Sequence, residues 1–412
     1  MWSLFERGKT DSVKRSSGSR GTLADQGVCP TISEGPAESS LDSCDDCENV
    51  RITKATNRYE AWLGRQLRLL GEDLKLKHEL MRSGPFPFLR ATYYRWAQIW
   101  KTVCGPAARG PRVLAVGDLH VENFGTWRDV EGRLVWGIND FDEVWTLSYT
   151  NDLIRLATSA LLAELSCDAK AGIDAIVKGY AEALEAGGRA FVLAEHHSPL
   201  RQMATARLHE PEAYWAKLHA LPECSEAAPA GVEKAIDRMM PERGMRWKAA
   251  HRIAGLGSLG RERWVCIAEY HGGSVAREAK ALAPSACLWA ERGKGTAAIH
   301  YQEILDRSVR SRDPFVRLQK RWIVRRLAPD CSRIELSALP KERDEMRLLH
   351  AMGWETANVH LGSQKARTLL ADLQKRRRGW LLAAARKMQK AVLADFDDYR
   401  RAEVSQTGRT EH

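Results

Sequence analysis

The sequence has no long uninterrupted apolar segment. No run reaches the about 20 apolar residues that a helix needs to cross a bilayer, and the N-terminus lacks the apolar core of a secretory signal. Nine cysteines, an odd number, are scattered through 412 residues rather than spaced as a disulfide framework. We therefore expect a cytoplasmic protein with no transmembrane segment.

A cysteine-based zinc module and a nucleic-acid-binding motif are also missing. Cys44 and Cys47 form one C-x-x-C pair, and no second pair follows at zinc-binding spacing. The chain shows no internal repeat and no specific motif for recognising nucleic acid. These observations argue against a zinc domain and against a sequence-specific reader of nucleic acid.

What the chain does have is an excess of positive charge. It carries 63 Lys and Arg against 53 Asp and Glu, a formal net charge of +10, and its pI is about 9.2. This balance favours an anionic partner, namely a nucleotide, nucleic acid, an acidic protein or a phospholipid surface. A basic surface that only keeps the protein soluble is the alternative, so charge alone does not choose a function.

Composition divides the chain into four parts. Residues 1–50 are rich in Ser, Gly and acids without periodicity, which predicts a disordered tail. Residues 51–245 hold an acidic cluster followed by helical segments, and residues 246–340 hold glycine-rich and strand-like segments. Residues 341–412 predict C-terminal helices, whose basic run could touch a membrane or nucleic acid or form a solvated face.

Polar side chains are concentrated between Pro111 and Ser159, at the ends of apolar runs typical of buried strands. The cluster comprises Asp118, His120, Glu122, Asn123, Asp140, Asp142 and Glu143. Carboxylates at strand ends are costly to bury unpaired, so such clusters usually bind a metal or transfer protons. Two turns capped by Asn and Asp are the alternative, and the functional interpretation is preferred.

The spacing within this cluster indicates phosphoryl transfer. Asp118 and Asn123 stand in a D-x-x-x-x-N pattern, and Asp140 follows a predicted hairpin. Protein kinases place a catalytic aspartate, a magnesium-binding asparagine and a second metal-binding aspartate in this arrangement. Asn123 and Asp140 would supply oxygen ligands to Mg²⁺, and Asp118 would orient and deprotonate an attacking hydroxyl. Asp142 fits a further metal ligand or a turn cap.

A second motif lies downstream. Gly255, Gly257 and Gly260 form a G-x-G-x-x-G that includes Ser258, and the following pattern is strand, turn and strand, ending near Lys280. A dinucleotide-binding fold would place a helix directly after the glycines. Strands after the glycines favour instead a flap over nucleotide phosphates, with the strand lysine pairing to them.

Two further residues are assigned by position. Glu303, on the next predicted helix, is the expected acidic partner of Lys280. Pro85 and Pro87 indicate an extended entry to the segment that carries Arg90. Arg90 could reach a phosphate or carboxylate, or form a structural ion pair.

The order of the motifs predicts an unusual topology. In kinases the glycine-rich flap and its lysine precede the catalytic loop, whereas here they follow it. A circular permutation reconciles the two, because the termini of compact domains often lie close together. We therefore expect an α+β, protein-kinase-like fold that is circularly permuted, with a predominantly helical larger lobe and a small β-rich nucleotide flap lobe.

Two family resemblances are carried by these residues. Asp118-Leu119-His120 with Asn123, and Asn139-Asp140-Phe141, resemble motifs of aminoglycoside and choline phosphotransferases. The chain resembles more closely a mostly bacterial family of uncharacterised proteins, domain-of-unknown-function family 2252, over about residues 53–362. This second resemblance is carried by PFPFLR (85–90), VGDLHVENFG (116–125), INDFDE (138–143), DLIRLATS (152–159) and GLGSLG (255–260).

The resemblance to phosphotransferases implies a function. It implies an ATP-dependent phosphotransferase that uses Mg²⁺ or Mn²⁺, with His120 beside the catalytic Asp118 and with Asp152 supporting the catalytic loop. The acceptor would be a small molecule or a protein, with an acidic one suited to the basic chain. Nucleotidyl transfer, a nucleotide-binding pseudokinase scaffold, and a metal hydrolase using Asp118, His120, Asp140 and Asp142 remain as alternatives.

Overall fold

Helices and antiparallel sheets are both present in the computed structural model, which confirms the α+β class. The structure describes residues 51–164, 166–193, 197–206, 208–293, 295, 297–332 and 342–407. The tail expected over residues 1–50 lies outside them. No helix in this part of the chain is long and apolar enough to cross a membrane.

The glycine-rich motif belongs to a five-stranded antiparallel sheet with the strand order β6-β7-β8-β10-β9. Its strands are β6 (Lys248–His251), β7 (Arg263–Tyr270), β8 (Gly273–Ala281), β9 (Arg317–Gln319) and β10 (Trp322–Leu327). The central strands β7 and β8 are buried over most of their length. Helix α9 (Ala230–Asp237) packs against β8 and β10, while α8 (Pro211–His219) contributes Leu218 to a separate apolar cluster on the sheet.

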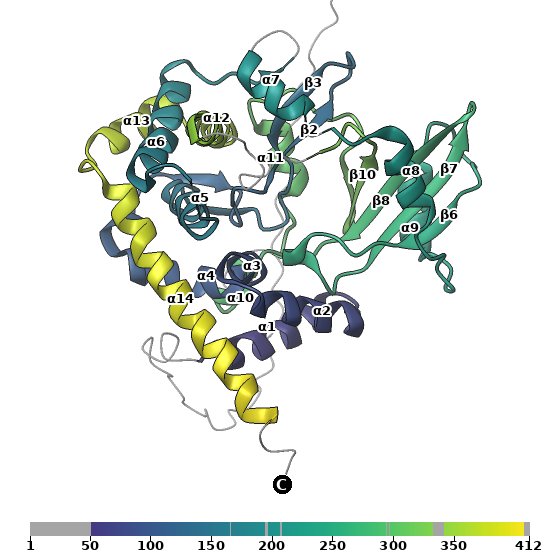
Figure 1. The fold of residues 1–412 in the computed structure, drawn as a ribbon, viewed down its shortest axis with the longest axis horizontal. Helices are drawn as coiled ribbons and strands as arrows, with labels where there is room; N and C mark the ends of the chain where they lie inside the picture. The colour runs from purple at the N-terminus through teal and green to yellow at the C-terminus, as the bar shows by residue number, and fades with distance from the viewer. Residues whose placement is uncertain are drawn as a thin grey trace, which may run out of the picture. The chain divides into compact units, whose positions relative to one another are not determined.

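The acidic cluster belongs to a larger, mainly helical part of the chain (Figure 1). Two small sheets carry it, β1 with β4 and the three-stranded β2-β3-β5. Their bounds are β1 (Arg112–Ala115), β2 (Phe124–Arg128), β3 (Leu134–Ile138), β4 (Trp145–Ser148) and β5 (Phe191–Val192). The hairpin predicted between Asn123 and Asp140 is the pair β2-β3. The acidic loops therefore begin and end at paired strands.

Helices surround these loops. They are α1 (Ile52–Gln66), α2 (Gly71–Arg82), α3 (Pro85–Ala91), α4 (Tyr93–Cys104), α5 (Thr150–Leu162), α6 (Ala169–Glu185), α7 (Ser198–Thr205), α10 (Ala286–Ala290), α11 (Tyr301–Arg307), α12 (Glu342–Leu361), α13 (Ala366–Gln374) and α14 (Trp380–Thr407). The extended entry expected at Pro85 and Pro87 is wrong, because both prolines lie in the first turn of α3. Backbone N–H groups in a first turn have no helical partner, so proline costs nothing there.

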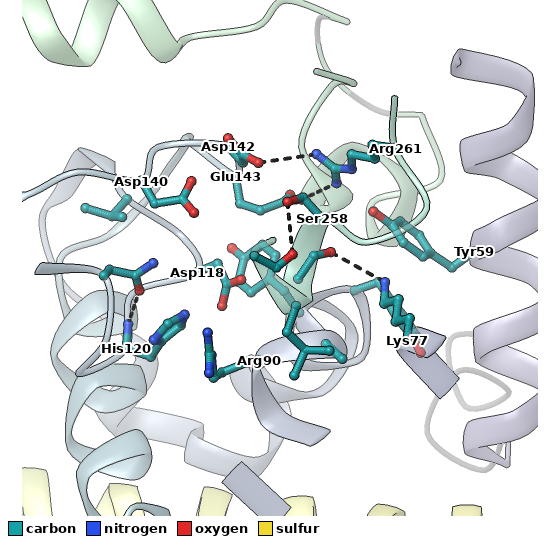
Figure 2. Close-up of a pocket in the computed structure, with 18 residues that line it drawn as sticks. Tyr59, Lys77, Arg90, Asp118, His120, Asp140, Asp142, Glu143, Ser258 and Arg261 are labelled. Atoms are coloured by element: carbon teal, nitrogen blue, oxygen red, sulfur yellow. Dashed lines mark hydrogen bonds and ion pairs between the residues drawn. The ribbon is translucent and has the colours of Figure 1, made fainter. Parts of the chain in front are cut away.

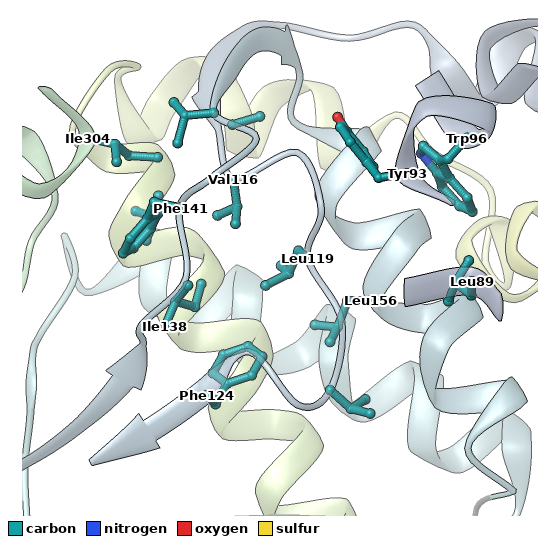
Figure 3. Close-up of a cluster of buried hydrophobic side chains, with 14 of the residues drawn as sticks. Leu89, Tyr93, Trp96, Val116, Leu119, Phe124, Ile138, Phe141, Leu156 and Ile304 are labelled. Carbon is teal, nitrogen blue, oxygen red and sulfur yellow. The ribbon is translucent and has the colours of Figure 1, made fainter. Parts of the chain in front are cut away.

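A continuous apolar core packs against one side of the acidic loops. Leu119 lies within the first loop and Phe141 within the second, and each is at most 1% exposed. Figure 3 shows both side chains directed into one cluster with residues from α3, α4, α5 and α11. Alternating apolar and acidic residues in these loops therefore place the acids on the opposite side from the core.

Two glycines allow the closest helix contact of the larger part. Gly179 of α6 and Gly353 of α12 face each other's helix backbone. A Cβ atom on Gly179 would overlap the carbonyl oxygen of His350, and one on Gly353 would overlap that of Ile176. Neither backbone can move without separating the two helices, so the α6–α12 packing requires both glycines.

We expect Gly179→Ala to lower the free energy of unfolding by about 1–3 kcal/mol, because the added methyl overpacks a rigid backbone contact. Denaturant unfolding followed by circular dichroism measures this. Gly71→Ala is the matched control, since no atom lies within 4 Å of its Cβ position, and it should leave stability unchanged or slightly raised. Equal midpoints for the two variants would contradict the proposed close contact.

Candidate functional site

One pocket brings the two sequence motifs together (Figure 2). Nine of the residues predicted from sequence line it, namely Arg90, Asp118, His120, Asn123, Asp140, Asp142, Gly255, Gly257 and Ser258. The structure adds others that the sequence did not indicate, among them Tyr59, Lys77 and Arg261. Residues distant in the chain thus share one chemical environment.

The loop that carries Asp118 is held by Asp152, the third residue of α5. The Asp152 carboxylate accepts hydrogen bonds from the backbone N–H of Val116 at 2.7 Å and of Gly117 at 3.0 Å. His360 of α12 lies 3.0 Å from the same carboxylate, and both side chains are fully buried. Gly117 has a φ of +82°, and a Cβ there would overlap the Glu143 carbonyl oxygen. Asp152 therefore supports the loop, and glycine is required at its tightest point.

Asp118 forms an ion pair with Arg155, which lies one turn after Asp152 in α5. The Arg155 side chain is fully buried, and that of Asp118 is 19% exposed. The Arg155 Nε lies 2.7 Å from Asp118 Oδ1, and its Nη2 bonds the same oxygen. The Arg155 guanidinium is stacked over the rings of Tyr93 and Trp96, with 4.9 Å to each centroid. This arrangement fixes the direction in which the Asp118 carboxylate points.

The charge state of Asp118 is set by competing effects. Burial raises the pKa of the Asp118 carboxyl to about 7, with Arg155 acting in the opposite sense and Glu143 and Asp140 raising it further. A carboxyl with this pKa changes charge near neutral pH, which is the range in which a general base is effective.

The turn between Asp118 and β2 is organised by side chains of the turn itself. The Asn123 Oδ1 accepts a hydrogen bond of 2.6 Å from the backbone N–H of His120. The His120 Nδ1 in turn accepts one of 3.2 Å from the N–H of Glu122. The backbone carbonyl of Asn123 also receives the N–H of Asn139 at 2.9 Å, which joins this turn to the loop of Asp140. One lone pair of the Asn123 amide oxygen remains for a further ligand.

Lys280 of β8 projects into the loop that follows β3. Its Nζ lies 2.7 and 2.6 Å from the two carboxylate oxygens of Asp142 and 3.7 Å from Asp140. The expected pairing of Lys280 with Glu303 is wrong, because Glu303 pairs with His300 at 2.7 Å and with Arg307 at 3.2 Å within its own helix. Glu303 does not line the pocket.

Few side chains of the pocket are arranged to bind a metal ion. Within the described residues no group of three or more His, Cys, Asp and Glu side chains could hold a metal ion. Asn123 and Asp140 remain as an amide and a carboxylate oxygen donor on the pocket wall. This donor set fits Mg²⁺ only if substrate phosphates complete the coordination, which is how Mg²⁺ is usually bound in phosphoryl-transfer sites.

The glycine-rich loop between β6 and β7 passes directly over Asp118. Gly255 has a φ of +72° and Gly260 one of +90°, both in the left-handed region. A Cβ on Gly257 would lie 3.0 Å from the carbonyl oxygen of Arg90 and 3.5 Å from Asp118 Oδ2. Gly257 thus allows the closest approach of the two motifs.

Ion pairs fasten the glycine-rich loop to its neighbours. Arg261, directly after the loop, donates to Glu143 at 3.1 Å, and Glu143 also accepts the backbone N–H of Ala286 at 2.7 Å. Arg90 lies 2.5 Å from Glu122. Of the two interpretations left open for Arg90, the structure shows the ion pair to a carboxylate.

Sequence patterns do not indicate the roles of Arg155 and Arg261, for different reasons. Arg155 lies inside an apolar helix pattern, where one buried arginine is not separable from a surface residue. Arg261 follows the glycines in a segment read as loop. Their adjacency to the quoted motifs was the available signal. The partner of Arg155 lies 37 residues away at Asp118, and that of Arg261 lies 118 residues away at Glu143.

The comparison with known families covers the part of the chain that holds the acidic loops. Residues 69–218 match the model of a family described as "Uncharacterized protein conserved in bacteria (DUF2252)". The match covers part of the chain and supports the family resemblance that its motifs carry. No curated protein and no solved structure gives a significant match to the chain.

We expect Asp152→Asn to lower the free energy of unfolding by about 3 kcal/mol. Both carboxylate oxygens accept N–H bonds, so either orientation of an amide would direct its NH₂ at a donor. Urea unfolding provides the measurement. Asp174→Asn, which alters an exposed pair with Lys170, should change stability by less than about 0.5 kcal/mol. An unchanged midpoint for Asp152→Asn would show that Asp152 does not hold the loop.

Proposed function

We propose that this pocket is the active site of an ATP-dependent phosphotransferase with a circularly permuted, kinase-like arrangement. One observation carries the proposal: the glycine-rich loop, which follows the acidic loops in sequence, lines the same pocket as Asp118 and Asp140. Lys280 of the following strand pairs with Asp142, which also lines this pocket. Two unrelated functions of these segments would give no reason for Gly257 to approach Asp118. A permuted order of the kinase motifs accounts for the close approach of the glycine-rich loop to Asp118.

Each residue would have a distinct task in this reaction. Asp118 would accept the proton of the acceptor hydroxyl as its oxygen attacks the γ-phosphorus, and Arg155 would keep the carboxylate aimed at that proton. Asn123 and Asp140 would hold Mg²⁺, which neutralises charge on the phosphate oxygens when it is bound. The backbone of the glycine-rich loop would enclose the phosphates.

Lys280 would contribute to the site as part of a pair. Asp142 holds its ammonium 2.6 Å away, so the pair presents a directed cation rather than a free one. Because Asp142 pairs with Lys280, the proposed metal ligands are Asn123 and Asp140. The metal-hydrolase alternative loses support for this reason, since Asp142 binds Lys280 and the His120 ring binds the backbone of Glu122.

The acceptor is proposed to be acidic. A cavity of about 180 Å³ lies behind the loop of Asp140 and is lined by Arg310, Arg312, Arg317 and Arg326 together with Asn139 and Phe141. Asp306 and Asp313 are the acids in its wall, so positive charge is in excess. Arginines beside an aromatic ring favour a planar or phosphorylated anion.

We expect ATP with Mg²⁺ to raise the melting temperature by several degrees, since a ligand at a hundred times its Kd adds about 2.7 kcal/mol to stability. Asp140→Ala should abolish the magnesium-dependent part of the shift, whereas Asp174→Ala on the exposed face of α6 should retain it. If neither ATP nor GTP changes the melt with any divalent ion, the proposal fails. Label carried from the γ-phosphate to an acidic acceptor indicates phosphorylation, and label carried from the α-phosphate indicates nucleotidyl transfer.

The pH profile tests the role of Asp118. Because the pKa of its carboxyl is raised to about 7, the base is protonated below that pH, and the turnover rate should rise with pH through about 7 and level off above it. Asp118→Asn should remove roughly 100-fold or more of the rate. Arg155→Met should move the profile to higher pH, because the arginine lowers the pKa. A profile that is flat from pH 5 to 9 in the wild type would exclude Asp118 as the base.

A further inference from the structure

A buried lysine outside both motifs lines the pocket. Lys77 lies on α2, its side chain is 3% exposed, and Figure 2 shows it extending toward the glycine-rich loop. Its Nζ makes one hydrogen bond among the described residues, a long one of 3.4 Å to the carbonyl oxygen of Gly257. An ammonium group has three N–H donors, so this one is poorly satisfied.

Lys77 differs in this respect from the other cations of the pocket wall. Arg90 pairs with Glu122 and Arg261 with Glu143. Among the residues that the structure describes, Lys77 has no carboxylate within 4.0 Å and forms no ion pair. Burying an ammonium without a partner costs several kcal/mol. A lysine that buries only its methylene stem keeps its ammonium group in water. Lys77 is 3% exposed, so its ammonium group is not in water.

The surroundings of Lys77 indicate the kind of group that would satisfy it. Its ammonium lies beside Gly257, whose backbone approaches Asp118, while the strand cation Lys280 is occupied by Asp142. Lys77 lines the pocket under the glycine-rich loop, and Lys280 is not among the lining residues. A compact anion with several acceptor oxygens matches an ammonium whose three N–H donors make only one long hydrogen bond among the described residues, and a phosphate group has this chemistry.

We propose that the Lys77 ammonium binds a phosphate group of the ligand in this pocket. The inference rests on the proposed function, and it assigns the phosphate-binding cation to α2 rather than to the strand lysine. The bond is a charge-assisted hydrogen bond from Nζ to a phosphate oxygen, formed in place of the weak contact with Gly257.

The charge state of Lys77 permits this role at neutral pH. Burial lowers the pKa of the Lys77 ammonium to about 8, Glu60, Glu143 and Asp118 raise it, and Arg261 lowers it. Below pH 8 the group is mainly a cation and can bind phosphate. At pH 8 about half is neutral amine, which is the form that attacks an aldehyde.

A labelling experiment on the full chain tests the site without a variant. Pyridoxal 5′-phosphate carries both a phosphate and an aldehyde, so its carbonyl should form an imine with the Lys77 amine and release water, and borohydride then reduces the imine to a secondary amine. Peptide mass mapping should find Lys77 modified ahead of exposed lysines such as Lys75. Pyrophosphate should protect Lys77 and leave Lys75 unaffected. Labelling of Lys77 that pyrophosphate does not reduce would overturn the proposal.

A binding experiment measures the contribution of the charge. We expect Lys77→Met, which keeps the length of the side chain, to weaken binding of ATP and of pyrophosphate by roughly tenfold to a hundredfold. Binding of adenosine, which has no phosphate, should not change. Lys77→Arg should retain much of the affinity. Lys75→Met is the matched control on the same helix, because Lys75 is exposed and paired with Glu72.

The outcomes separate this inference from the proposed function. If the wild type and Lys77→Met bind ATP equally, the role of Lys77 is wrong and the phosphotransferase proposal stands. If the wild type binds pyrophosphate, Lys77→Met does not, and neither binds ATP, the phosphate site stands and the ATP-dependent function is wrong. If the wild type binds neither ligand, both are overturned.

Discussion

The buried carboxylate of Asp152 is the constraint on which the candidate site depends. It accepts the N–H groups of Val116 and Gly117 and lies beside His360, so it joins the first acidic loop to α5 and α12. A carboxylate removed from water is stable only when its oxygens are fully bonded. The same bonds that satisfy Asp152 thereby hold the backbone that presents Asp118, and the position of the proposed base follows from the stability of the core.

A second feature of the site is that charges at the pocket are paired between elements that are distant in the sequence. Lys280 of the five-stranded sheet pairs with Asp142 of the acidic loops, and Arg261 pairs with Glu143. These pairs link the sheet to the acidic loops. They also set the electrostatics of the pocket, because a carboxylate that is paired with a cation is less available to bind a metal ion. Asp118 and Asp140 also line the pocket. Asp118 pairs with the buried Arg155, and Asp140 lies 3.7 Å from the ammonium of Lys280.

Sequence patterns were informative where function is encoded in short segments. The spacing of Asp118 and Asn123, the hairpin before Asp140 and the glycine-rich loop are all local, and each is present in the structure. Glu303 is predicted as the acidic partner of Lys280 because it lies on the next helix, and this prediction is wrong. In the structure Glu303 is satisfied by His300 and Arg307 of its own helix, and i,i+3 or i,i+4 pairs of this kind form without any tertiary contact.

The sequence alone determined the chemical character of the site: which loops carry carboxylates, where the backbone needs glycine, and which family the chain resembles. These properties depend on residue type and on spacing within one segment. Only the tertiary structure decided which charges meet. Arg155 is brought to Asp118, Asp142 to Lys280, and Lys77 to the glycine-rich loop by the packing of α5, β8 and α2. A buried charge takes its role from its partners, and those partners lie in distant parts of the chain.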